Sequence, residues 1–210
     1  MMYPKSDREK SSENAAPLYG LILAGGKSSR MKKDKALLVY REQPHLLDTY
    51  HLVASLCVKT WVSNRKKQSD TSIRNQLPQI LDSQGDIGPL GGILSAFDIF
   101  PHVAWLVVSC DLPFLDRQAL SHLIRSRNPR CQATSFTGTE NRLPEPMCTI
   151  YEPASFHHLR QFAKQGNYSP REALMACSLR AVTPTSNRTL QNVNVPGEYS
   201  AAREKLRVNP

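Results

Sequence analysis

The 210-residue sequence has few cysteines, and their placement excludes two common roles for them. The five cysteines are odd in number and widely separated, and no two form a C-x-x-C pair (Cys57, Cys110, Cys131, Cys148 and Cys177). This pattern fits neither a disulfide framework nor a zinc-ligand cluster. We expect reduced thiols in or near the core of a cytoplasmic protein.

Long apolar runs are absent as well. No stretch approaches the roughly 20 apolar residues that a membrane helix needs, so no membrane partner is expected. The first 17 residues, MMYPKSDREKSSENAAP, are polar and lack the apolar centre of a secretory signal. Residues 1–17 are therefore predicted to be a disordered lead-in. Residues 18–206 are predicted to form one domain, because the length fits one domain and no repeat or linker divides it.

Acidic residues are outnumbered: 18 Asp and Glu face 27 Lys and Arg, which gives a net charge of +9. Such a surplus favours an anionic partner. Nucleic acid is the usual first hypothesis, but the basic residues are dispersed. Their densest group, Arg65-Lys66-Lys67, has no interleaved aromatic residue and is expected to be a solvated loop. Phosphorylated small molecules explain the charge equally well, and a basic nucleic-acid-binding module is kept only as a distant alternative.

Strand and helix patterns alternate from Leu18 onward. Strands are expected at Leu18–Leu23, Thr60–Ser63, Gln79–Leu81, Trp105–Cys110, Cys131–Phe136, Met147–Tyr151 and Ala181–Thr185. Helices are expected at His45–Cys57, Pro89–Phe100, Asp116–Arg127, Pro153–Lys164, Pro170–Cys177 and Gly197–Leu206. The alternation predicts an α/β fold with an open, mainly parallel, Rossmann-like sheet and helices on both faces. Ligands of such sheets bind beyond the carboxyl ends of the strands.

The first expected strand ends in a glycine turn, Leu23-Ala-Gly-Gly-Lys-Ser-Ser-Arg-Met31, followed by Asp34-Lys35. Two adjacent glycines, Gly25 and Gly26, let the backbone approach a ligand and turn its N–H groups toward phosphate oxygens. Arg30 and Lys35 add positive charge to the same loop. The pattern is neither a P-loop nor G-x-G-x-x-G. It predicts either a phosphate-binding loop or an ordinary glycine-rich turn with exposed basic side chains.

Asp111 directly follows the buried strand Trp105–Cys110. A carboxylate there is costly unless it is paired. Magnesium suits the position, because it binds one or two carboxylates and completes its shell with phosphate and water. The alternative is that Asp111 caps the turn before Pro113.

Two further segments are candidates for ligand contact: the glycine-rich Asp82–Gly92, and Asn192-Val-Asn194, whose two amides share one side of an extended segment.

Taken together, these segments resemble the nucleotidyltransferase family that includes molybdenum cofactor guanylyltransferase. The family pattern L-A-G-G-x-S-x-R-M followed by D-K-A matches Leu23–Met31 with Asp34–Ala36, and G-P-L-x-G-I-x-S-A matches Gly88–Ala96. C-D-x-P-F matches Cys110–Phe114, and N-x-N-x-P-x-E matches Asn192–Glu198. The matches keep the family's order from about Leu18 to Leu206. The chain departs from the pattern at Lys32-Lys33 and at Arg41–His45, where the family has a glycine and a G-x-P-L step.

The resemblance implies a nucleotidyl/glycosyltransferase-A-like fold and transfer of GMP from GTP to the phosphate of molybdopterin, with Mg²⁺ as cofactor. It also leaves room for a protein that hands over or receives the cofactor, and it implies no nucleic-acid partner. Carried over by position, the implied nucleotide site comprises Leu23, Ala24, Gly25 and Gly26 as a cradle, Lys35 on phosphate, Asp82 near the nucleotide, and Asn64 (or Ser63) on guanine. Asp111 is the implied magnesium ligand, Asn194 a second metal contact, and Lys35, Asp111 and Arg30 the catalytic residues.

Two close alternatives remain within the same chemistry. One is cytidylyl transfer to the same cofactor, and the other is nucleotidyl transfer to a sugar phosphate. The resembling cytidylyltransferases tend to read L-A-A-G in the loop, so the Gly25-Gly26 pair favours guanine by resemblance.

Overall fold

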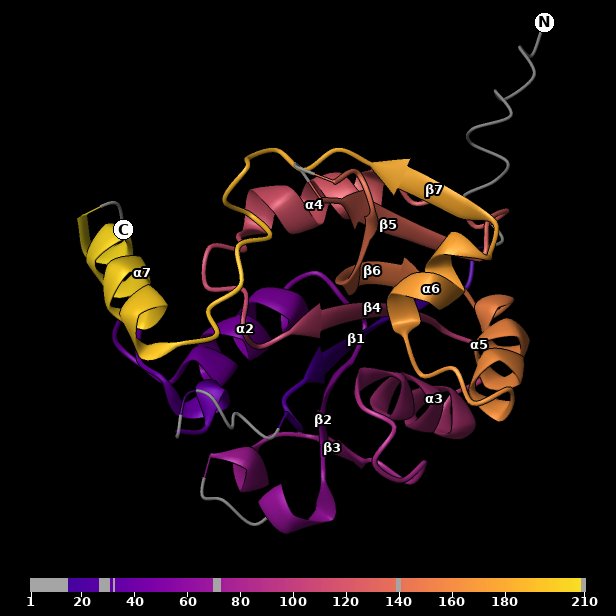
Figure 1. The fold of residues 1–210 in the computed structure, drawn as a ribbon, viewed down its shortest axis with the longest axis horizontal. Helices are drawn as coiled ribbons and strands as arrows, with labels where there is room; N and C mark the ends of the chain where they lie inside the picture. Colours follow the sequence, from indigo (N-terminus) through magenta and orange to yellow (C-terminus); the bar gives the residue numbers. More distant parts are fainter. Residues whose placement is uncertain (1–14, 27–30, 32, 70–72, 139–140, 209–210) are drawn as a thin grey trace, which may run out of the picture.

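The computed structural model describes residues 15–26, 31, 33–69, 73–138 and 141–208. Its centre is a seven-stranded sheet in the order β3-β2-β1-β4-β6-β5-β7 (Figure 1). The strands are β1 (Leu18–Leu23), β2 (Thr60–Asn64), β3 (Gln79–Leu81), β4 (Ala104–Ser109), β5 (Ala133–Thr137), β6 (Pro144–Tyr151) and β7 (Leu179–Val182). β6 runs antiparallel to β4 and β5, and the other neighbouring pairs are parallel. The predicted single-domain α/β fold with a mainly parallel sheet is confirmed.

Helices cover both faces of the sheet (Figure 1). They are α2 (His45–Ala54), α3 (Pro89–Ile99), α4 (Arg117–Arg125), α5 (Ser155–Lys164), α6 (Pro170–Met175) and α7 (Pro196–Val208), with short 3₁₀ turns η1 (Lys35–Leu37), η2 (Lys66–Gln68) and η3 (Arg74–Gln76). The side chains of β4 alternate between two cores, as the period of a strand requires. Leu106 and Val108 pack with α2 and α4, whereas Trp105 and Val107 pack with α3, α5 and α6.

Every strand and helix expected from the sequence is present; β1 and β3 have the predicted bounds, and the other elements have shifted ends. Helix α2 stops at Ala54 rather than Cys57. β7 begins at Leu179 rather than Ala181, because its bounds follow from pairing with β5, where Ala133 faces Leu179. The pairing of β5 with β7 depends on the tertiary structure and cannot be predicted from a local sequence pattern.

Most of the predicted lead-in, residues 1–14, lies outside the described residues, so that prediction stays untested. The last residues before β1 are bound to the domain. The Pro17 carbonyl accepts a hydrogen bond from Ala104 N (3.0 Å), and the Ala16 carbonyl accepts one from Arg127 Nη2 (2.8 Å). In the part of the chain that the structure describes, no helix is long and apolar enough to cross a membrane. All five cysteines belong to that part and are free thiols.

The parallel strands place chain segments that are far apart in sequence at one edge of the sheet. Leu23 at the end of β1 faces Ser63 of β2 on one side and Ser109 of β4 on the other. Asn64 at the end of β2 faces Leu81 at the end of β3. The residues that follow these four strands therefore meet at one place, where the sequence pattern predicted the ligand site.

His45, at the start of α2, lines a smaller pocket of about 240 Å³ together with Arg41, Asp48 and Asp116. Its side chain is 3% exposed, and neither ring nitrogen has a hydrogen-bond partner among the described residues. Burial, with a smaller contribution from the Arg41 charge, lowers the pKa of His45 from 6.5 to about 4. The imidazole is therefore neutral in the folded protein at neutral pH.

This burial predicts acid sensitivity of the fold. Between about pH 6.5 and pH 4 the unfolded chain binds a proton at His45 and the folded chain does not, so stability falls as the pH drops through that window. The full effect is on the order of 3 kcal/mol, at 1.36 kcal/mol per pKa unit. Denaturant unfolding of the wild type and of His45→Gln across this window measures it. The wild type should lose stability more steeply, and equal slopes would contradict the prediction.

Candidate functional site

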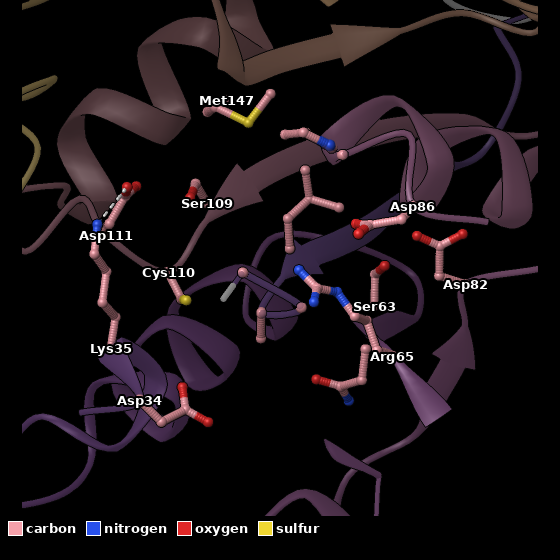
Figure 2. A pocket seen from close by; sticks show the side chains of 18 of the residues that line it. Asp34, Lys35, Ser63, Arg65, Asp82, Asp86, Ser109, Cys110, Asp111 and Met147 are labelled. Carbon is pink, nitrogen blue, oxygen red and sulfur yellow. Dashed lines mark hydrogen bonds and ion pairs between the residues drawn. The ribbon is translucent and has the colours of Figure 1, made fainter. Parts of the chain in front are cut away.

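A pocket of about 410 Å³ lies at the carboxyl ends of β1, β2 and β4 (Figure 2). It is lined by Leu23, Ala24, Gly25, Gly26, Asp34, Lys35, Ser63, Asn64, Arg65, Asp82, Asp86, Gly88, Pro89, Gly92, Ser109, Cys110, Asp111, Met147 and Asn194. All the site residues predicted from the sequence line this pocket, apart from Arg30. Arg30 lies outside the described residues, so the structure says nothing about its predicted role.

The glycine turn after β1 forms one wall through its backbone. Ala24 N donates to Ser63 O (3.0 Å), which continues the pairing of β1 with β2 by one residue. A Cβ atom on Gly25 would lie 3.5 Å from Arg65 N, and a Cβ atom on Gly26 would meet no described atom within 4 Å. The main chain of both glycines lines the pocket, and the open space beside Gly26 leaves room for a close ligand, as a phosphate-binding loop requires.

Lys35 joins three parts of the chain at the pocket. Its Nζ donates to Asn194 Oδ1 (2.6 Å) and lies 3.4 Å from Asp111 Oδ2. Its side chain is only 16% exposed, so the alternative of an ordinary turn with exposed basic side chains does not hold for Lys35. The lysine is held by Asp34, whose Oδ1 accepts from Ala36 N (3.1 Å) and so caps the η1 turn that contains Lys35. An ammonium with three donors held next to a carboxylate is suited to contact a phosphate as well.

The C-terminal motif N-x-N-x-P-x-E places Asn194 through its backbone. Glu198 Oε2 accepts from Asn194 N (2.6 Å) and Val195 N (3.3 Å), at the start of α7. Val193 N donates to the Asp111 carbonyl (3.1 Å), so the segment is tied directly to the residue that follows β4. The second amide of the motif, Asn192, is exposed and does not line the pocket.

Asp111 has one carboxylate oxygen that is already paired and one that is not. Oδ2 faces Lys35, whereas Oδ1 is buried and has no hydrogen-bond partner among the described residues. A buried carboxylate oxygen without a partner is costly, so the site favours a cation at that atom. A turn cap would accept a hydrogen bond from a backbone N–H group. No described backbone N–H donates to this carboxylate oxygen. No group of three or more His, Cys, Asp or Glu in the described chain forms a metal site by itself.

Arg65, Asp82 and Asp86 lie across the pocket from Lys35 and Asp111 (Figure 2). Asp82 is fixed by Gln84 N, which donates to its Oδ1 (3.0 Å). The expectation that Arg65 belongs to a solvated loop is wrong: Arg65 lines the pocket, while its neighbours Lys66 and Lys67 are exposed. The cause is that Arg65 directly follows β2, at the carboxyl edge of the sheet.

Asn64 lines the pocket, but its amide is already engaged. Its Oδ1 accepts from Arg74 Nε (2.9 Å), and its Nδ2 donates to Gln79 Oε1 (2.9 Å). The side chain has no exposed surface. In this arrangement Asn64 fixes the end of β2 and does not offer its amide to a ligand. Ser63, the alternative from the sequence, also lines the pocket.

The glycines of G-P-L-G-G allow α3 to pack against the pocket. Gly88 precedes the helix with φ 71°, a conformation that favours glycine. A Cβ atom on Gly92 would lie 3.0 Å from Leu23 Cδ2 and would press even closer on Ser63 Oγ. Any side chain at position 92 would therefore push against the ends of β1 and β2.

Besides Arg65, three pocket residues escaped the sequence-based selection: Ser109, Cys110 and Met147. Burial, reinforced by the nearby Asp111 charge, raises the pKa of Cys110 to about 12. This thiol is therefore neutral at neutral pH and unsuited to act as a nucleophile. Met147 comes from β6, whose proximity to β4 is a matter of sheet order, and no sequence signal marked it.

Comparison with known proteins gives a consistent result. Residues 20–181 match the model of a family described as the MobA-like NTP transferase domain. The chain is 33% identical over 190 residues to a molybdenum cofactor biosynthesis bifunctional protein of Synechocystis sp., covering 90% of this chain and 55% of that protein. It is 28% identical to the molybdenum cofactor guanylyltransferase of Pseudomonas aeruginosa, covering 90% of this chain and 96% of that protein.

Solved structures share the fold. Molybdopterin-guanine dinucleotide biosynthesis protein A from Archaeoglobus fulgidus superposes with a TM-score of 0.76 at 18% identity, over 90% of this chain and 99% of that one. A nucleotidyl transferase from Methanothermobacter thermautotroptrophicus superposes with a TM-score of 0.74 at 14% identity, over 92% of this chain and 99% of that one. At these identities the likeness establishes the fold alone.

Proposed function

This chain belongs to the nucleotidyltransferase family of the MobA-like NTP transferase domain, and from that premise we propose that it transfers GMP from GTP to the phosphate of molybdopterin. The observation that carries the proposal is the pocket itself. It gathers the backbone of Gly25 and Gly26, Lys35 and Asp111 at the carboxyl ends of parallel strands, where an α/β sheet binds nucleotides. A cytoplasmic location, and a partner that delivers or receives the cofactor, belong to the same proposal.

Guanine is favoured by the groups opposite Lys35 and Asp111. A guanine base presents two adjacent donors, N1–H and N2–H₂, and two acceptors, O6 and N7. Carboxylates accept from such donors and an arginine fork donates to such acceptors. Asp82, Asp86 and Arg65 supply both kinds of group in this part of the pocket. Cytosine lacks the pair of adjacent donors, so this set of residues supports GTP over CTP.

The residues present fit a divalent cation. Asp111 Oδ1 is buried without a partner, and the described lining holds four carboxylates against two cations. A triphosphate entering such a pocket needs added positive charge. Asp111 would hold Mg²⁺ with substrate phosphate and water as the remaining ligands. When bound, the ion would neutralise charge on the α- and β-phosphates of the nucleotide. Asn194 is a weaker second ligand, because its Oδ1 already accepts from Lys35.

The reaction needs positioning more than acid–base chemistry. An oxygen of the acceptor phosphate attacks the α-phosphorus of GTP in line, the bond from that phosphorus to the bridging oxygen breaks, and pyrophosphate leaves. The attacking oxygen is already anionic, so no general base is required. Lys35 holds a positive charge where the phosphate charge develops, and the Gly25–Gly26 backbone orients the triphosphate.

Nucleotide choice tests the proposal directly. Calorimetry in the presence of magnesium should show GTP binding at least about tenfold more tightly than CTP, ATP or UTP, as expected of a site that hydrogen-bonds its base. Pyrophosphate release from each of the four triphosphates, with and without molybdopterin, should be fastest with GTP and should require the acceptor. Equal or tighter binding of CTP would favour the cytidylyltransferase alternative. Pyrophosphate release with a sugar phosphate in place of molybdopterin would favour the sugar-phosphate nucleotidyltransferase alternative.

Replacing Lys35 with alanine should lower kcat by about 10²- to 10³-fold, the loss typical of one pre-organised donor. Lys33→Ala is a matched control, because Lys33 is an exposed lysine two residues away. It should keep kcat within about twofold, as surface substitutions usually do. Steady-state pyrophosphate release and thermal melting are the measurements. Near-normal turnover of Lys35→Ala, accompanied by a large loss of melting temperature, would assign Lys35 a structural role only.

Asp111→Asn separates a metal ligand from a turn cap. The change keeps the side-chain shape and removes the charge, so turnover should fall by about 10³-fold. Without metal the variant should melt at the same temperature as the wild type or slightly higher, because removing the charge from a carboxylate with one buried, unpartnered oxygen offsets the lost ion pair with Lys35. Asp116→Asn is the control: Asp116 caps α4 by accepting from Ala119 N (2.7 Å), and asparagine caps equally well. Retained turnover of Asp111→Asn at ordinary magnesium concentrations would contradict the metal assignment.

A further inference from the structure

Arg74 has no exposed surface and lies behind the wall of the nucleotide pocket. It belongs to η3, in the connection between β2 and β3, and is not itself a pocket-lining residue. A buried guanidinium is costly unless its N–H groups find acceptors. The acceptors that it finds come from segments that do line the pocket.

Three segments converge on this guanidinium. Nη2 lies 2.8 Å from Asp34 Oδ2 and donates to the Ala24 carbonyl (3.2 Å), while Nε donates to Asn64 Oδ1 (2.9 Å). Gln79 fixes the main chain of Arg74, because its Nε2 donates to the Arg74 carbonyl (2.9 Å). One side chain therefore connects the glycine turn after β1, the segment before Lys35 and the end of β2.

Asp34 carries the connection to Lys35. Its Oδ2 pairs with Arg74, and its Oδ1 accepts from Ala36 N at the start of the turn that contains Lys35. Lys35 in turn reaches Asp111 and Asn194. Arg74 also neutralises Asp34, the carboxylate next to Lys35 in the chain.

We propose that Arg74 is a positioning residue of the nucleotide site. It fixes the spacing between the backbone cradle at Ala24–Gly25 and the η1 turn, so that the cradle and Lys35 contact the same nucleotide. The expected effect of Arg74 on turnover rests on the proposed function. Arginine suits the position because its planar fork serves several acceptors at fixed angles, which the point charge of a lysine does not.

The test compares Arg74→Met and Arg74→Lys with a matched control, Arg127→Met. Arg127 is also a mostly buried arginine that pairs with a carboxylate, Glu152 (2.6 Å), and donates to a backbone carbonyl, that of Ala16 (2.8 Å). These contacts lie at the opposite end of β1, away from the pocket. Two readouts apply: hydrogen exchange of the Ala36, Leu37 and Leu38 amides well below the melting temperature, and kcat for pyrophosphate release from GTP.

Arg74→Met should speed exchange of these three amides by about tenfold or more, because the cap of η1 is loosened. Its kcat should fall by about 10²-fold, as expected when a reacting group is displaced by about 1 Å. Arg74→Lys should lie between Arg74→Met and the wild type in both readouts. Arg127→Met should lower the melting temperature while changing exchange of these amides and kcat by less than about twofold.

Equal exchange and equal kcat for Arg74→Met and Arg127→Met would show that Arg74 only stabilises the fold, and would overturn the proposal. If Arg74→Met does not fold, Arg74→Lys decides by the same comparison. A wild type that releases no pyrophosphate from GTP would defeat the proposed function. The exchange measurement would still decide whether Arg74 positions the Lys35 segment.

Discussion

The contact of one ammonium group with a carboxylate and an amide holds the site together. Lys35 precedes its partner Asp111 by 76 positions and its partner Asn194 by 159. The parallel pairing of β1 with β4 makes the first contact possible, because it brings both strand ends to one edge. The second contact requires the C-terminal segment to dock on the residue after β4, through Val193 N and the Asp111 carbonyl. These contacts therefore form only when β1 and β4 have paired and the segment before α7 has docked.

The pocket lining is net negative among the described residues, whereas the chain as a whole is net positive. The sequence carries +9, yet the described lining holds four carboxylates and two cations. Three of these carboxylates have distinct partners: Asp34 is paired with buried Arg74, Asp111 is paired through one oxygen with Lys35, and Asp82 accepts from Gln84 N. The net charge favours an anionic partner. The local arrangement supports the further proposal that the anion is bound together with a cation.

Much of the fold and many of the pocket residues could be predicted from the sequence, for local reasons. The apolar run before Ala24-Gly25-Gly26 and the run before Asp111 identify two strand ends, and in a parallel sheet strand ends mark the ligand edge. The site residues chosen on that basis line the pocket wherever the structure describes them. The sequence misjudged Arg65 because a basic triplet looks like a solvated loop when the end of β2 is not yet known.

The sequence alone determined the order of strands and helices and the segments that carry glycine, lysine and aspartate at strand ends, since periodicity and turn chemistry are local properties. Only the tertiary structure decided which polar atoms remain available. It engaged both halves of the Asn64 amide with Arg74 and Gln79, buried Arg74 behind the pocket wall, and left one Asp111 oxygen without a described partner. Hydrogen-bond partners that are far apart in sequence are set by packing, and no spacing of residues along the chain records them.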